Sequence, residues 1–131
     1  MVAIVVAEDD HDILMVVQRL LTRAGHDVVP TADGAEAWEA IQRQPPDLVV
    51  SDISMPRMSG TELCRLIRTT EVTRDIPVLI ISGHLIPGDT AAVEHATAVL
   101  RKPFLAREFA SCVDKVLQTG HVEGQGPAVC P

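Results

Sequence analysis

The chain alternates between two patterns of apolar residues. The segment 2–7 is a continuous apolar run, typical of a strand buried on both faces, and shorter apolar runs within 27–30, 47–51, 77–81 and 98–101 predict four further strands. Apolar residues at helical spacing follow each run and predict helices at 13–24, 35–44, 59–69, 87–96 and 105–117. This strict alternation of strand and helix predicts an α/β fold, in which helices cover both faces of a parallel sheet.

Two of the predicted helices have distinctive sequences. Ser59 precedes one helix and is a favourable N-cap. The helix at 87–96 has Val93 as its only large apolar residue. We therefore expect this helix to be short or mobile.

Composition and charge limit the class of protein. The 131 residues and an apolar share of 47% suffice for one domain with a core. The net charge is −7, so the chain lacks a basic surface for nucleic acid or for an anionic membrane. The longest apolar run, Met1 to Ala7, is far shorter than the ~20 residues that span a bilayer and lacks the basic flank of a signal peptide. We expect a cytoplasmic protein.

The cysteines and the last residues complete this organisation. Cys64, Cys112 and Cys130 are odd in number and form no Cys-x-x-Cys pair, which favours free thiols in a reducing cytosol. Glycine and proline gather in residues 119–131. We interpret this stretch as a flexible tail, or the stump of a linker, after a domain at 1–118.

Chemically active residues follow four of the predicted strands. They are Glu8, Asp9 and Asp10 after the first strand, Asp52 after the third, Ser82 after the fourth and Lys102 after the fifth. Ligands of such sheets bind at the carboxyl ends of the strands, so these side chains should converge. Clustered carboxylates repel one another unless a cation lies among them, and Mg²⁺, with Mn²⁺ as an alternative, prefers such oxygen ligands. An ionised Asp52 can then attack a phosphoryl group.

Four segments in this order resemble the receiver domain of two-component response regulators. They are Val-Val-Ala-Glu-Asp-Asp, Ser-Asp-Ile-Ser-Met-Pro-Arg-Met-Ser-Gly, Ile-Ile-Ser-Gly and Arg-Lys-Pro-Phe. The resemblance covers residues 2–117 and is to single-domain, chemotaxis-regulator-like receivers. It implies a flavodoxin-like, doubly wound sheet of five parallel strands in the order 2-1-3-4-5. It also implies a phosphorylation-controlled switch rather than an enzyme, in which Asp52 accepts a phosphoryl group from a histidine kinase or phosphotransfer protein.

The resemblance assigns roles around the metal ion. Asp9 and Asp52 would ligate it directly, the backbone carbonyl of Ser54 would complete the protein ligands, and Glu8 would act through water. Asp10 falls one position too late in the motif, so we expect it to be a negative charge at the start of the first helix.

The resemblance also assigns roles around the phosphoryl group. Ser82 and Lys102 would contact it, and the bond from Lys102 to Pro103 is expected to be cis. His84, two residues after Ser82, stands where family members tune hydrolysis of the acyl phosphate. Val99 stands where the family usually has a Phe or Tyr whose rotamer reports phosphorylation.

These departures leave alternatives for the function. Val99 has no ring to move, and the stretch from Ser82 to Lys102 is about two residues shorter than is usual in the family. A receiver-fold scaffold with an impaired or atypical switch is therefore the alternative function. In either case, a downstream protein or a second copy would bind the face formed by 87–96, 98–101 and 105–117.

A phosphatase of the haloacid-dehalogenase type is a further alternative, because such enzymes also use an aspartate nucleophile and Mg²⁺. Their Asp-x-Asp signature follows the first strand. In this sequence Glu8-Asp9-Asp10 stands there, and the nucleophile candidate Asp52 follows the third strand.

Overall fold

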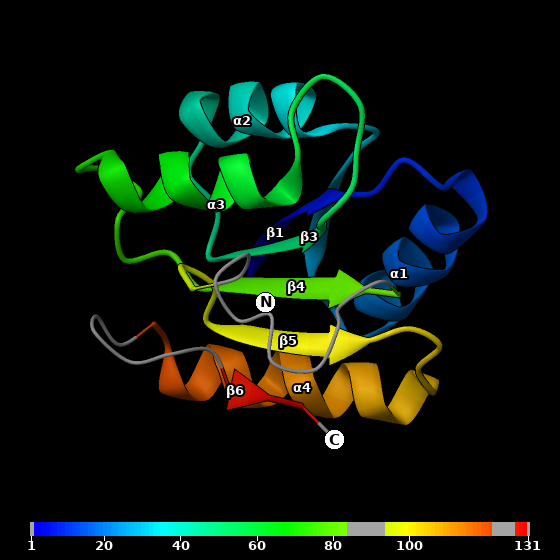
Figure 1. The fold of residues 1–131 in the computed structure, drawn as a ribbon. Helices are drawn as coiled ribbons and strands as arrows, with labels where there is room; N and C mark the ends of the chain where they lie inside the picture. The colour runs from blue at the N-terminus through cyan, green and yellow to red at the C-terminus, as the bar shows by residue number, and fades with distance from the viewer. Residues whose placement is uncertain (1, 84–93, 122–127, 131) are drawn as a thin grey trace.

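The computed structural model describes residues 2–83, 94–121 and 128–130. In this part of the chain, parallel strands form one sheet in the order β2-β1-β3-β4-β5-β6 (Figure 1). The strands are β1 (Ala3–Ala7), β2 (Asp27–Thr31), β3 (Leu48–Asp52), β4 (Val78–Ser82), β5 (Ala98–Arg101) and β6 (Ala128–Val129). The helices are α1 (His11–Arg23), α2 (Gly34–Arg43), α3 (Gly60–Thr69) and α4 (Ala106–Thr119). The predicted flavodoxin-like order 2-1-3-4-5 is confirmed, and β6 extends it beyond β5.

The two faces of the sheet are covered by different pairs of helices (Figure 1). Successive strand residues point to opposite faces, so Ile4 and Val6 of β1 belong to one apolar cluster and Val5 to the other. The first cluster includes Val17 of α1 and Phe109 of α4, whereas the second includes residues of α2 and α3. Burial on both faces explains why the central strands are continuous apolar runs in the sequence.

Polar side chains cap the first three helices. Asp10 Oδ1 accepts hydrogen bonds from the backbone N–H groups of Asp12 and Ile13 at the start of α1. Asp33 and Ser59 cap α2 and α3 in the same way. The expected positions of Ser59 and Asp10 at helix starts are therefore confirmed.

The segment between β4 and β5 departs from the prediction as far as it is described. Residues 87–93 of the predicted helix lie outside the described residues, and residues 94–95 form a turn. None of the helices in the described part of the chain has the length and apolar content to cross a membrane.

The segment after α4 also differs from the prediction. A flexible tail is predicted for 119–131, but Ala128–Val129 pair with β5 as β6. Free thiols are predicted, but Cys112 of α4 and Cys130 form a disulfide, and Cys64 is the free cysteine. Both predictions are wrong for the residues concerned, because β6 brings two cysteines 18 residues apart in sequence to a Cα–Cα distance of 5.9 Å.

Candidate functional site

Three carboxylates meet at the carboxyl ends of β1 and β3. Glu8 and Asp9 follow β1 directly, and Asp52 is the last residue of β3. One carboxylate oxygen from each lies within 4.8 Å of the other two. Their exposure is graded, since Glu8 is 1% exposed, Asp52 is partly buried and Asp9 is exposed. The structure therefore brings together the three predicted metal-binding acids, with Glu8 at the inner end of the cluster and Asp9 at its exposed side.

Lys102, which follows β5, supplies a positive charge to this cluster. Its Nζ donates a hydrogen bond to Glu8 Oε1 at 2.7 Å and lies 3.4 Å from Asp52 Oδ2. Burial raises the pKa of Glu8, although the hydrogen bond from Lys102 opposes this effect. Burial alone would lower the pKa of Lys102, but its hydrogen bond to Glu8 and the charge of Asp52 outweigh burial and raise it. Lys102 therefore remains positively charged beside Asp52.

The backbone around Asp52 fixes the direction of its side chain. Asp52 Oδ1 accepts a hydrogen bond from Ile53 N–H at 2.8 Å, and Oδ2 faces Lys102. The chain then folds back, and Gly60 N–H donates to the carbonyl oxygen of Ile53 at 2.7 Å. A Cβ at Gly60 would collide with the backbone carbonyl of Asp52, so glycine is required for this close approach. The loop closed in this way holds Ser54 beside the carboxylates.

These residues border a cavity of about 400 Å³, which we call the acidic pocket. It is lined by Glu8, Asp9, Asp10, Ile13, Asp52, Ser54, Gly83 and Lys102. Three clustered carboxylates and one ammonium group sum to a formal charge of about −2, which a divalent cation would cancel. Oxygen donors of this kind are the ligands that hard divalent cations prefer, so the residues present fit Mg²⁺.

Two of the other predicted residues, Ser82 and Val99, are not among the residues that line the acidic pocket. Ser82 is buried at the end of β4, where its carbonyl oxygen accepts a hydrogen bond from Lys102 N–H at 2.9 Å. Val99 is 4% exposed and belongs to the second apolar cluster. His84 lies outside the described residues. The peptide bond between Lys102 and Pro103 is cis, as predicted.

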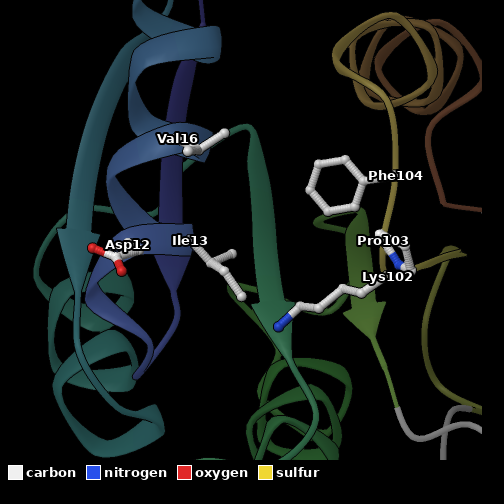
Figure 2. A pocket seen from close by; sticks show the side chains of 6 residues that line it. All are labelled: Asp12, Ile13, Val16, Lys102, Pro103 and Phe104. Atoms are coloured by element: carbon white, nitrogen blue, oxygen red, sulfur yellow. The ribbon is translucent and has the colours of Figure 1, made fainter.

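A second cavity, the α1 groove, opens beside the acidic pocket (Figure 2). It has a volume of about 400 Å³ and is lined by Asp12, Ile13, Val16, Lys102, Pro103 and Phe104. Figure 2 shows Ile13 and Val16 of α1 pointing across the groove toward Lys102 and Phe104. Val16 is 53% exposed, and Phe104 stacks on Phe109 with ring centroids 5.4 Å apart.

Sequence reasoning missed the α1 groove, although one signal was available. Val16 lies three residues after Ile13 and so extends its apolar row along α1 toward solvent. The contact of Ile13 and Val16 with the groove formed by Pro103 and Phe104 depends on the order of the strands, because α1 follows β1 and Pro103 follows β5. Only the three-dimensional structure reveals that Lys102 borders both cavities.

An ion pair also joins two loops near the pocket, and sequence reasoning missed it. Arg57 donates hydrogen bonds from Nε and Nη2 to the two carboxylate oxygens of Asp33 at 2.9 and 3.2 Å. The backbone N–H of Glu36 and the guanidinium of Arg57 lower the pKa of Asp33. Asp33 thus caps α2 and also ties α2 to the loop that follows Asp52.

Known protein sequences share this organisation. The family described as response regulator receiver domain matches residues 4–114. The response regulator receiver protein CpdR of Brucella abortus (strain 2308) is 37% identical over 117 residues, which cover 87% of this chain and 95% of CpdR. The alkaline phosphatase synthesis transcriptional regulatory protein PhoP of Bacillus subtilis (strain 168) is 29% identical over 119 residues. That match covers 91% of this chain but 50% of PhoP, so this chain spans about half of that relative.

Solved structures share the fold. The chemotaxis response regulator CheY4 of Vibrio cholerae superposes with a TM-score of 0.84 at 28% identity, covering 88% of this chain and 98% of CheY4. A putative response regulator from Chloroflexus aurantiacus J-10-fl has the same TM-score of 0.84 at 27% identity, covering 89% of this chain and 98% of that chain.

Proposed function

Because the chain belongs to the response regulator receiver domains of two-component systems, we propose that Asp52 accepts a phosphoryl group from a phosphohistidine with the help of Mg²⁺. The observation that carries this proposal is the convergence of Glu8, Asp9 and Asp52, with Lys102 Nζ at 3.4 Å from the Asp52 carboxylate. The cluster combines a nucleophile, a cation site and a fixed positive charge. These are the components that phosphoryl transfer to a carboxylate requires.

The metal ion would be held at the exposed side of the cluster. Asp9, Asp52 and the backbone carbonyl of Ser54 would ligate it, and Glu8 would act through water. When bound, Mg²⁺ supplies positive charge to the phosphoryl oxygens and offsets the repulsion among the carboxylates. The exposure of Asp9 and the burial of Glu8 support this division of roles.

The chain's own residues position the transferred group. The hydrogen bond from Ile53 N–H holds one oxygen of Asp52, so the other oxygen is directed toward the pocket and Lys102. In the transfer, a bond forms from Asp52 to phosphorus, and the bond from phosphorus to the donor imidazole breaks. The ammonium of Lys102 stabilises the negative oxygens of the group in transfer. We propose no turnover of a separate substrate.

The same lysine can report that phosphorylation has occurred. Lys102 Nζ is closer to Glu8, at 2.7 Å, than to Asp52, at 3.4 Å. A phosphoryl group on Asp52 adds negative charge and strong acceptor oxygens, so it competes with Glu8 for the ammonium. Because Lys102 directly follows β5, this competition transmits the state of Asp52 to β5 and to α4 beyond it.

The α1 groove supports a docking site for a protein donor beside the acidic pocket. A phosphohistidine can reach Asp52 only if its protein covers the rim of the acidic pocket. The groove shares Lys102 with that pocket and offers Ile13 and the exposed Val16, which an apolar patch on a histidine kinase or phosphotransfer protein can cover. Val16→Asp should therefore slow transfer from a protein donor and leave transfer from acetyl phosphate unchanged.

The experiment that tests the proposal weighs the intact protein after incubation with acetyl phosphate and Mg²⁺. The wild type is expected to gain the mass of one phosphoryl group, and the gain should disappear with a chelator or with Asp52→Asn. Asp10→Asn is the matched control, because asparagine also caps a helix and Asp10 already caps α1. A gain that persists in Asp52→Asn would overturn the assignment of the phosphoacceptor.

A receiver-fold scaffold without a working switch is the second candidate. The observation that favours it is Val99, which is buried in the second apolar cluster and has no ring that could change between buried and exposed positions. A scaffold would bind its partner with equal affinity before and after acetyl phosphate treatment. The Asp52→Asn variant would bind the partner with the same affinity as the wild type. A phosphorylation-controlled switch would show a difference in both comparisons.

A further inference from the structure

The outer edge of β5 is covered by a segment distant in sequence. Strand β6 runs parallel to β5, with Ala98 opposite Ala128 and Val99 opposite Val129. Cys130 N–H then donates a hydrogen bond to the carbonyl oxygen of Val99 at 2.9 Å. Figure 1 shows β6 beside β5 at the end of the sheet, next to α4.

A covalent bond fastens this segment to the domain. Cys112, on the buried side of α4, is joined by a disulfide to Cys130, and the two residues are 3% and 8% exposed. A contact at the other end of the segment adds to this attachment, because Thr97 Oγ1, just before β5, lies 2.9 Å from His121 Nδ1. The described residues after α4 are therefore held along the first part of β5, at Thr97, Ala98 and Val99.

We infer that the Cys112–Cys130 disulfide is a redox-sensitive lock, which keeps β6 on the edge of β5 and releases it when the bond is reduced. The length of β6 supports this inference. A strand of two residues forms too few backbone hydrogen bonds to stay paired on its own, since stable strands usually have about five or six residues. The disulfide keeps the ends of the segment together, so the segment gains less conformational entropy when β6 separates from β5.

The chemistry of release is thiol–disulfide exchange. A dithiol reductant supplies two electrons and two protons, so the Cys112–Cys130 bond becomes two thiols and the reductant becomes a disulfide. The third cysteine takes little part, because burial raises the pKa of Cys64 to about 11 and keeps it in the unreactive thiol form. The exchange therefore concerns the cysteine pair at the β5 edge.

Release has a defined structural consequence. The N–H and C=O groups on the outer edge of β5 lose their partners in β6 and become available for pairing with another strand. This strand leads directly to Lys102, so the lock acts on the element that delivers Lys102 to the acidic pocket. The inference does not depend on phosphorylation of Asp52, because it rests on the disulfide and the strand pairing alone.

Amide hydrogen exchange measured residue by residue tests the lock in the full chain. Reduction of the air-oxidised wild type with dithiothreitol should speed exchange at Cys130 N–H by roughly a hundredfold, the scale expected for opening a loop of this size. The N–H of Lys102, which donates to Ser82 on the inner side of β5, is the internal control and should stay protected. Protection at Lys102 also shows that the reduced domain remains folded.

Two further measurements complete the test. Intact mass should show the air-oxidised protein lighter by two hydrogens than the reduced protein, and iodoacetamide added in denaturant should label Cys112 and Cys130 only if the protein was reduced first. The double variant Cys112→Ser/Cys130→Ser should show fast exchange at residue 130 and no response to dithiothreitol. Absence of the disulfide after air oxidation, or unchanged protection of Cys130 N–H after its reduction, would overturn the inference.

Discussion

The acidic pocket and the outer edge of β5 are built in different ways. The pocket consists of residues at the ends of β1, β3 and β5, whose positions follow from the order and direction of the strands. The edge is completed by β6 and a disulfide, which join segments 18 residues apart. Parallel topology therefore brings the pocket together, whereas the edge depends on a disulfide and on the pairing of a two-residue strand. The first arrangement concentrates charge, and the second restrains the chain.

The two regions also differ in what they contribute to stability. In the pocket, burial raises the pKa of Glu8, so keeping this carboxylate ionised at neutral pH costs folding free energy that Lys102 only partly offsets. At the β5 edge, the disulfide limits the freedom of the unfolded chain and favours the folded state. The buried carboxylate of the pocket thus lowers the free energy of unfolding at neutral pH, whereas the disulfide at the edge raises it.

The largest effect is expected when the pocket loses its positive charge. Lys102→Met leaves the buried Glu8 without its partner and should lower the free energy of unfolding by about 3 kcal/mol at pH 7. Because burial raises the pKa of Glu8 in the folded state, protonation of Glu8 favours folding at low pH. This contribution to the free energy of unfolding is lost as the pH rises through the raised pKa. The deficit should therefore shrink when urea unfolding is repeated at pH 5.

Two variants sharpen this result. Lys115→Met on the exposed side of α4 should leave the free energy of unfolding unchanged. Adding Glu8→Gln to Lys102→Met should restore most of the lost stability, since the unpaired carboxylate is gone. Equal destabilisation by both lysine variants would contradict the role assigned to the buried pair.

The next effect concerns the covalent contact at the edge. Cys130→Ala is expected to lower the free energy of unfolding by about 2 kcal/mol relative to the oxidised wild type. The reason is that the unfolded chain gains freedom when the loop is opened. Urea unfolding of both proteins with and without dithiothreitol provides the measurement, and the difference should vanish in reductant. A difference that remains in dithiothreitol would assign the effect to packing of Cys130 rather than to the bond.

A smaller effect separates two neighbouring aspartates. Asp9→Asn removes one charge from the proposed metal ligands and should weaken Mg²⁺ binding about tenfold, or roughly 1.4 kcal/mol. Asp10→Asn should leave the affinity unchanged, because the Asp10 side chain caps α1. Isothermal titration calorimetry with MgCl₂ measures both. Similar weakening by the two variants would point to general electrostatic attraction instead of a defined site.

The smallest effect is expected at the ion pair between the exposed Arg57 and the buried Asp33. Arg57→Ala removes one cause of the lowered pKa of Asp33, while the hydrogen bond from Glu36 N–H remains. A lowered pKa stabilises the fold above the unfolded value, near 3.9, and this contribution is lost as the pH falls through the folded value. In the variant the pKa of Asp33 is lowered less, so the free energy of unfolding should fall slightly less on acidification than in the wild type. Acid unfolding followed by circular dichroism measures this difference. An identical acid transition would show that Arg57 does not act on Asp33.

The predictable part of the molecule is the part that local patterns encode. Apolar runs and helical spacing define β1 to β5, and parallel strands place their carboxyl ends together, so the convergence of Glu8, Asp9, Asp52 and Lys102 follows from strand order. Capping positions are also local signals, as Ser59 shows. The family resemblance, which rests on the segments at these strand ends, agrees with the matched residues 4–114.

The unpredicted features depend on tertiary contacts. Ala128–Val129 is too short to carry a periodic pattern, and an odd number of cysteines does not tell which two will meet. The guanidinium of Arg68 is another example, because it donates hydrogen bonds to the carbonyl oxygens of His95 and Ile76. Each contact joins segments whose proximity is set by packing, so no window of the sequence reveals it.

The site of phosphorylation can be identified chemically. An acyl phosphate is reduced by borohydride to an alcohol, so phosphorylated protein treated with borohydride should yield homoserine at position 52 when its peptides are sequenced by mass spectrometry. We expect this conversion only after incubation with acetyl phosphate and Mg²⁺, and at no other aspartate. Homoserine at Asp9 or Asp10, or its absence at position 52 in protein that has gained a phosphoryl group, would contradict the role of Asp52 as the acceptor.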